Sequence, residues 1–212
     1  MGRQPGASSR LLQCASSRDQ REYGCENKGT TQPARATGRR RVSEFRIAAA
    51  GTADVPTVLA MIRGLAEFER LSHLCVATEE DLFHALFSDK PTVEVILAWE
   101  GAEAAGFALF FHNFSTFLGR PGLYLEDLFV RPHFRGRGYG RALLVYLARL
   151  AIERGCGRFE WAVLDWNASA IGFYQGLGAT ILPDWRITRV TGPALTSLAE
   201  QPLLQNGKTP LA

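Results

Sequence analysis

Along residues 45–190, segments with apolar residues at helical spacing alternate with short strand-like apolar segments. This succession predicts a mixed α/β domain. Apolar residues at helical spacing, such as Val55, Leu59 and Ile62, indicate amphipathic helices. Short runs rich in β-branched and aromatic residues indicate strands between them. The expected helices are 52–70, one that begins at Thr78, 140–155 and 168–178. The expected strands are 45–50, 92–100, 104–114, 122–130, 158–164 and 184–190.

The order of these elements predicts how the sheet is connected. A short Gly-containing stretch separates the strands at 92–100 and 104–114, which is a hairpin signal. The strand at 122–130 is followed by a helix and then by the strand at 158–164, which predicts a parallel crossover. A sheet with both antiparallel and parallel neighbours is therefore expected.

The two ends of the chain differ from this domain in composition. Residues 1–44 are rich in Gly, Ser, Arg and Gln and have little apolar periodicity, so we predict a disordered N-terminal extension. Residues 192–212 are interrupted by proline and weakly patterned, and we predict a C-terminal tail there. The folded domain is accordingly assigned to residues 45–191.

Charge separates the N-terminal extension from the domain. The chain carries a net charge of +3, but residues 1–44 alone hold nine Lys and Arg against four acidic residues, or +5, which leaves −2 for the remainder. A domain that binds nucleic acid is expected to present a basic surface, so no nucleic-acid partner is expected for this domain. The run Arg39-Arg40-Arg41 could contact an anionic partner, but a solvated tail is the simpler interpretation.

Other residue types exclude further classes of protein. No apolar run reaches the ~18 residues of a membrane span, and no apolar leader opens the chain, so we expect no membrane partner and a cytoplasmic location. The four cysteines contain no Cys-x-x-Cys pair, which argues against a disulfide scaffold. The four histidines lack ligand spacing, and no metal site is expected.

Glycine occupies every second position near the start of the helix at 140–155, in the sequence from Arg135 to Gly140. A helix start offers unpaired N–H groups and the positive end of the helix dipole. Without a Cβ at these glycines, a phosphate can lie against the backbone, and Arg135 and Arg137 can donate charge-assisted hydrogen bonds. We therefore predict a diphosphate cradle, although a flexible turn would use the same residues. The spacing fits neither a P-loop nor a dinucleotide fingerprint.

Two motifs in this order resemble the Gcn5-related N-acetyltransferases, the GNAT superfamily. Arg135-x-x-Gly138-x-Gly140 is similar to the acetyl-CoA diphosphate loop of that family, and "WNASAIGFYQGLGA" is similar to its later Asn-x-x-Ala-x-x-Phe-Tyr segment. The stretch "YLEDLFV" and a late Trp-Arg pair look closer to the diamine (spermidine/spermine-type) acetyltransferase subfamily. The resemblance covers about Phe45–Val190. It implies the GNAT fold, a mixed central sheet of roughly six to seven strands flanked by about four helices.

The resemblance implies direct transfer of an acetyl group from acetyl-CoA to an amine. Tyr174 matches the general acid toward the CoA sulfur, although a tyrosine that only packs in the core would fit the same position. Glu126 matches the glutamate proposed as base in the diamine subfamily. Strict alternation would place Glu126, Leu128 and Val130 on one strand face and Asp127 on the other. Because buried charge needs a partner, Asp127 is expected to contact the substrate ammonium.

The resemblance also implies a set of coenzyme contacts, several of them through the backbone. The expected coenzyme-binding residues are Leu128, Phe129, Val130, Arg135, Gly136, Arg137, Gly138, Tyr139, Gly140, Asn167 and Tyr174. Leu128 and Val130 would offer backbone groups to the pantetheine arm, as a neighbouring strand does. Asn167 would also serve as N-cap of the following helix.

The acceptor is predicted to be a small primary amine. Glu69 corresponds to an acidic substrate contact of the subfamily, or is a solvated charge at a helix end. Trp185 would wall the cleft, or would pack on a strand. Ser115 and Phe117 stand where the subfamily usually has an acid and a tryptophan. A long polycation needs several carboxylates along the cleft, so a diamine or a lysine-like amino acid is expected at least as much as a polyamine.

Two other functions remain open from the sequence. One is a protein or peptide N-acetyltransferase, against which "FFHNFSTFLGRPG", interpreted as a lid, argues. The other is a non-catalytic CoA-binding regulatory domain, against which the presence of both Glu126 and Tyr174 argues. Members of the family commonly dimerise, so a homodimer is compatible with the resemblance.

Overall fold

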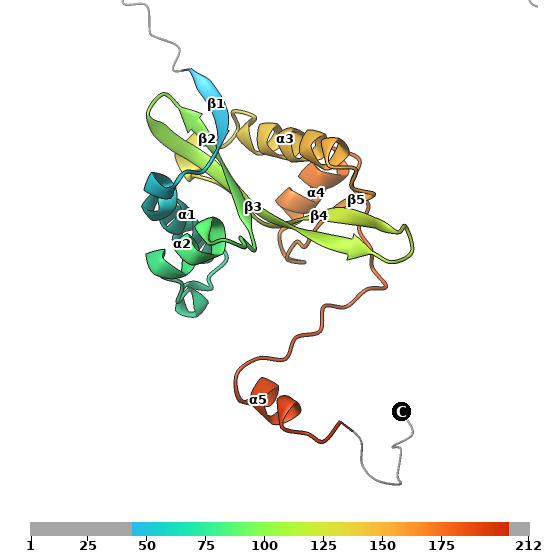
Figure 1. The fold of residues 1–212 in the computed structure, drawn as a ribbon. Helices are drawn as coiled ribbons and strands as arrows, with labels where there is room; N and C mark the ends of the chain where they lie inside the picture. The colour runs from blue at the N-terminus through green and yellow to red at the C-terminus, as the bar shows by residue number, and fades with distance from the viewer. Residues whose placement is uncertain (1–43, 204–212) are drawn as a thin grey trace, which may run out of the picture. The chain divides into compact units, whose positions relative to one another are not determined.

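A computed structural model describes residues 44–203 of the chain, so the extension predicted at 1–44 lies, apart from Glu44, outside the described residues. One mixed sheet of five strands forms the centre, in the order β1-β2-β3-β4-β5 (Figure 1). The strands are β1 Phe45–Ala49, β2 Glu94–Glu100, β3 Glu103–Ser115, β4 Arg120–Val130 and β5 Arg158–Trp161. The neighbours from β1 to β4 are antiparallel, while β5 lies parallel to β4. The predicted hairpin and crossover are therefore confirmed.

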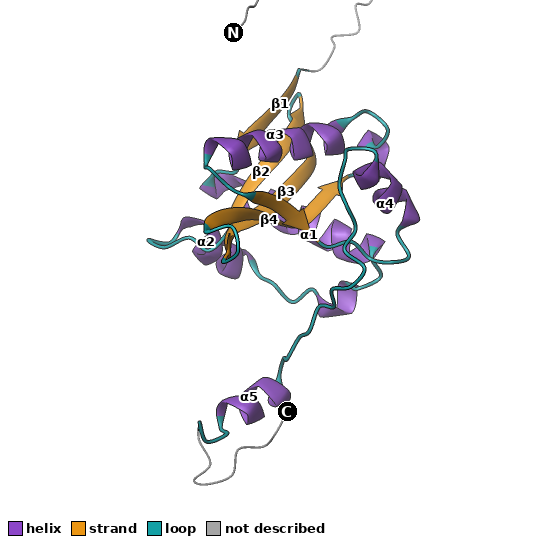
Figure 2. Cartoon of the chain, turned by 90° about the vertical axis from the view of Figure 1, so that its right-hand side faces the viewer, coloured by secondary structure: helices purple, strands orange, loops and turns teal. Residues whose placement is uncertain are grey.

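Helices cover both faces of this sheet. Helix α3 crosses the strands on the face seen in Figure 2, and α1 and α2 pack on the opposite face. The helices are α1 Val55–Phe68, α2 Glu79–Phe87, α3 Tyr139–Glu153, α4 Ala168–Gln175 and α5 Pro193–Ala199. Short 3₁₀ turns occur at Thr52–Asp54, Ser72–Leu74 and Pro132–Phe134. The fold is a mixed α/β fold, as predicted.

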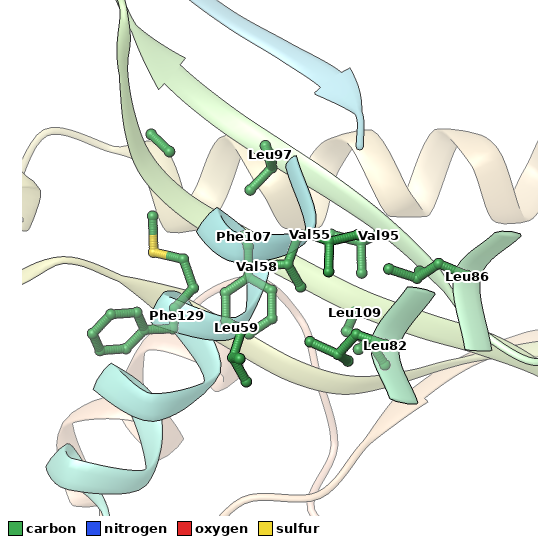
Figure 3. Packing of buried hydrophobic residues seen from close by; sticks show 12 residues of the cluster. Val55, Val58, Leu59, Leu82, Leu86, Val95, Leu97, Phe107, Leu109 and Phe129 are labelled. Atoms are coloured by element: carbon green, nitrogen blue, oxygen red, sulfur yellow. The ribbon is translucent and has the colours of Figure 1, made fainter. Parts of the chain in front are cut away.

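Two apolar cores hold these layers together, one on each face of the sheet. The first joins α1 and α2 to β2, β3 and the end of β4, with Phe107 fully buried at its centre (Figure 3). The second joins α3 and Tyr174 of α4 to the other face, around Phe110, Leu123 and Leu125. Because burial of each large side chain contributes about 1.5–3 kcal/mol, these two cores fix the positions of α1 and α4 relative to β4.

Local signals in the sequence account for where several helices begin and end. Thr78 is the N-cap of α2, since its hydroxyl accepts a hydrogen bond from the Asp81 N–H at 3.1 Å. The Asp81 carboxylate accepts in turn from the Thr78 N–H at 2.9 Å, which completes a capping box. Helix α3 is followed by Gly155 at φ +67°, a conformation that favours glycine after a helix end.

A β-bulge interrupts β4 at Glu126. In the ladder with β3, Leu125 pairs with Phe110 and Asp127 pairs with Leu109, so Glu126 is an extra residue without a partner in β3. The extra residue changes which residues share a face: Leu125 packs in the α3 core together with Leu128 and Val130. Strict alternation would place Leu125 on the face of Asp127, and this expectation is wrong at Leu125 alone, because the bulge shifts the two-residue period by one.

The structure corrects three further expectations. The strand predicted at 184–190 does not form, because no strand lies beside it to pair with its backbone groups, so the sheet of the described residues has five strands instead of six or seven. The tail predicted from residue 192 contains helix α5. The stretch interpreted as a lid is the paired end of the β3–β4 hairpin, where Ser115 lies opposite Arg120.

Candidate active site

One edge of β4 is left open where the sheet divides. Strand β5 pairs with β4 only between Gly122 and Leu125. Beyond that point β3 is the only strand beside β4 among the described residues. On the side where β5 lies, the backbone of residues 126–130 therefore pairs with no described strand. An extended ligand can lie along such an edge as an additional strand does. Leu128 and Val130, the predicted pantetheine contacts, lie on this open edge.

The glycine-rich loop that follows β4 has the backbone geometry of an anion cradle. Gly136 and Gly138 adopt φ angles of +76° and +85°, which favour glycine. A Cβ at either position would meet no atom within 4 Å, so both face open space. Gly138 is also the N-cap of α3, where the first N–H groups have no partner within the helix. A negatively charged group can therefore approach the backbone closely here.

The side chains that flank these glycines form hydrogen bonds with neighbouring strands, and these bonds fix the position of the loop. Arg137 donates two hydrogen bonds to the Glu100 carboxylate, at 3.1 and 2.9 Å, and the Tyr139 hydroxyl donates to the same carboxylate. Arg135 donates from Nε to the Val130 carbonyl oxygen at 3.0 Å. The loop is thus held by its side chains, while its backbone faces outward. Contact of Arg135 and Arg137 with a diphosphate stays a prediction.

Three carboxylates gather beside the bulge. Asp127 is half-buried on the α1 side of the sheet, where its cross-strand partner Leu109 packs in the α1 core. Burial, together with the charges of Glu126 and Glu69, raises the pKa of Asp127 to about 6. Burial also raises the pKa of Glu69, which caps the end of α1. The structure therefore brings the predicted base and both predicted ammonium contacts together, in a site that favours a cation.

The raised pKa of Asp127 predicts that this residue destabilises the fold at neutral pH. Its folded pKa, about 6, exceeds the ordinary value of 3.8, so the native state loses stability as the pH rises through that window. The difference corresponds to about 2 to 3 kcal/mol when the group is fully ionised. We expect Asp127→Asn to raise the unfolding free energy by about 2 kcal/mol at pH 8 and by far less at pH 4, as measured by urea denaturation.

Asp89→Asn is a suitable control, because Asp89 is an exposed aspartate in the loop after α2. The control is expected to change the unfolding free energy by less than about 0.5 kcal/mol at either pH. Equal unfolding free energies of Asp127→Asn and the unmodified protein at pH 8 would show that ionised Asp127 does not destabilise the native state.

Tyr174 lies on α4 at the inner end of this space. The side chain is 9% exposed, and its ring packs against Trp161 and Phe173 with centroid distances of 5.1 and 5.4 Å. Its hydroxyl has no hydrogen-bond partner within residues 44–203. The side-chain atoms in this range that are both unpaired and fully enclosed do not include this hydroxyl, so the hydroxyl reaches accessible space. Burial raises the pKa of Tyr174, and the charge of Glu69 adds to this effect. The hydroxyl therefore stays protonated at neutral pH and can donate.

Of the remaining predicted residues, Asn167 forms the helix cap expected from the sequence and Trp185 is largely exposed. The Asn167 side chain accepts from the Ala170 N–H at 3.1 Å and so caps α4, as predicted, while its amide N–H₂ has no partner in the described part of the chain. Trp185 is 75% exposed in a segment without secondary structure and has no ring contact with described residues, since the strand expected at 184–190 does not form. Its contact with a substrate stays a prediction.

Sequence reasoning missed Phe68 at this site. Its ring lies 6.1 Å from that of Trp166, which precedes Asn167, and 4.5 Å from the Arg135 guanidinium. The only signal in the sequence is its position next to Glu69. A separate hollow of about 330 Å³, lined mostly by apolar residues of β2, α2 and α3, shares no residue with the site. The charged residues that line the hollow, Glu94 and Arg154, are already paired with each other, whereas the carboxylates beside β4 face an open backbone edge.

The described residues offer neither a metal centre nor a membrane anchor. No three or more His, Cys, Asp or Glu side chains between residues 44 and 203 are arranged to hold a metal ion. No helix in this range is both long and apolar enough to cross a bilayer.

Comparison with known proteins identifies this arrangement. The model of the acetyltransferase (GNAT) family matches residues 61–179, which includes the glycine loop, the three-carboxylate site and Tyr174. The chain belongs to the GNAT family. It is therefore an N-acetyltransferase, as the resemblance implied, and the open edge of β4 lies within the part of the chain that defines the family.

Relatives of this GNAT protein act on small amines according to their names. An L-ornithine N5-acetyltransferase of Arabidopsis thaliana is 35% identical over 76% of this chain and 90% of its own length. A thialysine N-epsilon-acetyltransferase of Mus musculus is 37% identical over 74% of this chain and 99% of its own length. A human spermidine/spermine N(1)-acetyltransferase-like protein is 29% identical over 73% of this chain but only 24% of its own length. The kinship with the diamine acetyltransferases is confirmed.

Solved structures support the fold of this GNAT domain. An integron cassette protein from the V. cholerae mobile metagenome superposes with a TM-score of 0.64 and 28% identity, over 74% of this chain and 98% of the other. The GNAT fold expected from the sequence is confirmed.

Proposed function

We propose that this protein transfers the acetyl group of acetyl-CoA to the primary amine of a small diamine or a lysine- or ornithine-like amino acid. The observation that carries the proposal is the meeting of three carboxylates, Glu69, Glu126 and Asp127, with the Tyr174 hydroxyl beside the open edge of β4. Carboxylates attract the ammonium group of an amine, and a protonated hydroxyl can donate a proton to a leaving group. The open edge of β4 would hold the acetyl donor beside both.

The residues around this edge fit acetyl-CoA. The N–H groups of residues 136–140 would hold the diphosphate, because Gly136 and Gly138 leave space where a Cβ would stand. Leu128 and Val130 would pair with the pantetheine arm through their backbone, and the free amide of Asn167 adds a further donor. Acetyl-CoA supplies the thioester whose acetyl group is transferred.

Each chemical step falls to one side chain. The substrate ammonium must lose a proton before its nitrogen can form the new C–N bond, and the exposed carboxylate of Glu126 accepts that proton. Asp127 and Glu69 hold the second ammonium of the substrate, which does not react. As the C–S bond breaks, Tyr174 donates its proton to the departing sulfur. Solvent takes the second proton that the nitrogen releases as the neutral amide forms, and it returns Glu126 and Tyr174 to their starting states.

The acceptor is short because the acidic residues are clustered. Phe117, where the subfamily usually has a tryptophan, is 97% exposed at the tip of the β3–β4 hairpin. That tip is separated from Glu126 by the six residue steps of β4 from Arg120, or roughly 20 Å at the usual rise. Among the described residues, Glu69, Glu126 and Asp127 are the carboxylates that lie together at the proposed site. The relatives named for ornithine and thialysine support an acceptor of this length.

A panel of amines tests the proposal. The full chain is incubated with acetyl-CoA, and thiol release is measured with 1,4-diaminobutane, ornithine, lysine, thialysine, spermine and butylamine. We expect kcat/KM for the best short dication to exceed that for butylamine by at least tenfold, because butylamine lacks the second ammonium. Turnover with peptides alone would favour a protein acetyltransferase. Binding of CoA without turnover on any amine would favour a regulatory domain.

A further inference from the structure

Phe68 connects three segments that each contribute a residue to the proposed site. It is the last residue of α1, directly before Glu69. On one side its ring lies 6.1 Å from Trp166, in the segment that leads into α4 and Tyr174. On the other side the Arg135 guanidinium carbon lies 4.5 Å from the ring centroid. The side chain is 41% exposed, so burial alone does not account for a large aromatic residue here.

Arg135 is restrained in three directions. Its Nε donates to the Val130 carbonyl oxygen at 3.0 Å, and its guanidinium also lies 5.7 Å from the Phe129 ring centroid. Phe129 is buried and cannot shift away, since a Cβ added at Gly64 of α1 would already lie 3.1 Å from its ring. The guanidinium is thus held between the end of β4 and the end of α1, next to Gly136.

The terminal nitrogens of Arg135 remain available. Within residues 44–203, neither Nη atom has a hydrogen-bond or ion-pair partner. Arg137, the other arginine of the loop, already forms an ion pair with Glu100 at 2.9 Å. Of the two loop arginines, Arg135 is therefore the one whose guanidinium is not already paired with a carboxylate of the described residues, and both of its Nη atoms can donate to an anion. A planar guanidinium gives directed hydrogen bonds only when its orientation is fixed.

We infer that Phe68 is a positioning residue for the coenzyme, which holds the Arg135 guanidinium with its terminal donors toward the diphosphate. The inference rests on the proposed use of acetyl-CoA. A contact between an arginine and an exposed aromatic face is modest in strength, so the expected loss on removing the ring is about two- to fivefold in coenzyme affinity. Phe68 itself would touch neither the diphosphate nor the reacting atoms.

The test compares two acetyl donors in the full-length protein. Acetyl-CoA carries the diphosphate, whereas acetylpantetheine does not. We expect Phe68→Leu to raise KM for acetyl-CoA about threefold more than KM for acetylpantetheine, because leucine keeps an apolar side chain but removes the aromatic face. Phe83→Leu on α2 is the matched control, since Phe83 is 44% exposed and its aromatic contacts among residues 44–203 are with His84 and Phe87. The control should leave both KM values unchanged.

A double-mutant cycle separates positioning from packing. Arg135→Ala is expected to raise KM for acetyl-CoA on the order of tenfold or more, through loss of a charged donor. If Phe68 acts through Arg135, adding Phe68→Leu to Arg135→Ala should change that KM no further. Additive effects, or equal effects on both donors, would overturn the inference. Failure of the unmodified protein to use acetyl-CoA would instead overturn the proposed function.

Discussion

Gly138→Asp is expected to abolish the binding of acetyl-CoA. Gly138 has φ +85° and caps α3, so a side chain at this position is strained and stands in the space where the diphosphate would lie. The aspartate also adds a negative charge that repels the diphosphate. We expect the Kd for CoA, measured by calorimetry, to rise at least about 100-fold, which is roughly 2.7 kcal/mol or more.

Gly155→Asp provides a matched control for this variant. Gly155 has φ +67°, a Cβ there would also meet no atom within 4 Å, and it follows the other end of α3. The two variants therefore introduce the same residue into the same type of backbone, and only one of them lies in the cradle. The control should bind CoA as the unmodified protein does. Normal affinity in Gly138→Asp would place the coenzyme elsewhere.

Tyr174→Phe is expected to lower kcat about 100-fold with little change in KM for acetyl-CoA. General acid catalysis contributes about 10²–10⁴-fold, and this substitution removes only the donated proton. The ring keeps its packing against Trp161 and Phe173. The hydroxyl has no hydrogen bond to any described residue, so its loss should cost little stability. Steady-state kinetics with the best amine from the panel, and a thermal unfolding curve, would measure both quantities.

Tyr146→Phe is the control for the loss of a tyrosine hydroxyl. Tyr146 is partly exposed on α3 and lines the separate hollow, away from Tyr174. Its variant should keep full activity. If Tyr174→Phe also keeps full activity, a group other than Tyr174 protonates the sulfur, and water is then the simplest donor.

Local features of the fold were readable from the sequence because they depend on near neighbours. The capping residue Thr78 and the glycine after α3 mark helix ends within a few positions, and both predictions are confirmed. The strand predicted at 184–190 was wrong because a strand exists only when a distant segment pairs with it. Alternation gives the side-chain period but carries no information on the partner.

The candidate site was predictable in its members but not in its geometry. The resemblance to the family pointed to Glu126 and Tyr174, two adjacent acids in an apolar strand pointed to Asp127, and the structure brings these residues to one region. The bulge at Glu126 was not predictable, because an extra residue in one strand is defined by the register of the other. The ion pair between Arg137 and Glu100 spans 37 residues and depends on how the sheet is assembled. Phe68 was missed for the same reason.

The bulge has a consequence for how activity and folding are related in this chain. If residue 126 were deleted, Leu125 and Asp127 would become neighbours and would keep their present partners, Phe110 and Leu109. Every other side chain of β4 would remain on its present face, so neither apolar core requires the inserted residue. The strand would lose its local bend, and its separation from β5 would narrow. The proposed base thus occupies an inserted residue that neither core requires, and we expect its deletion to remove activity while the architecture stays intact.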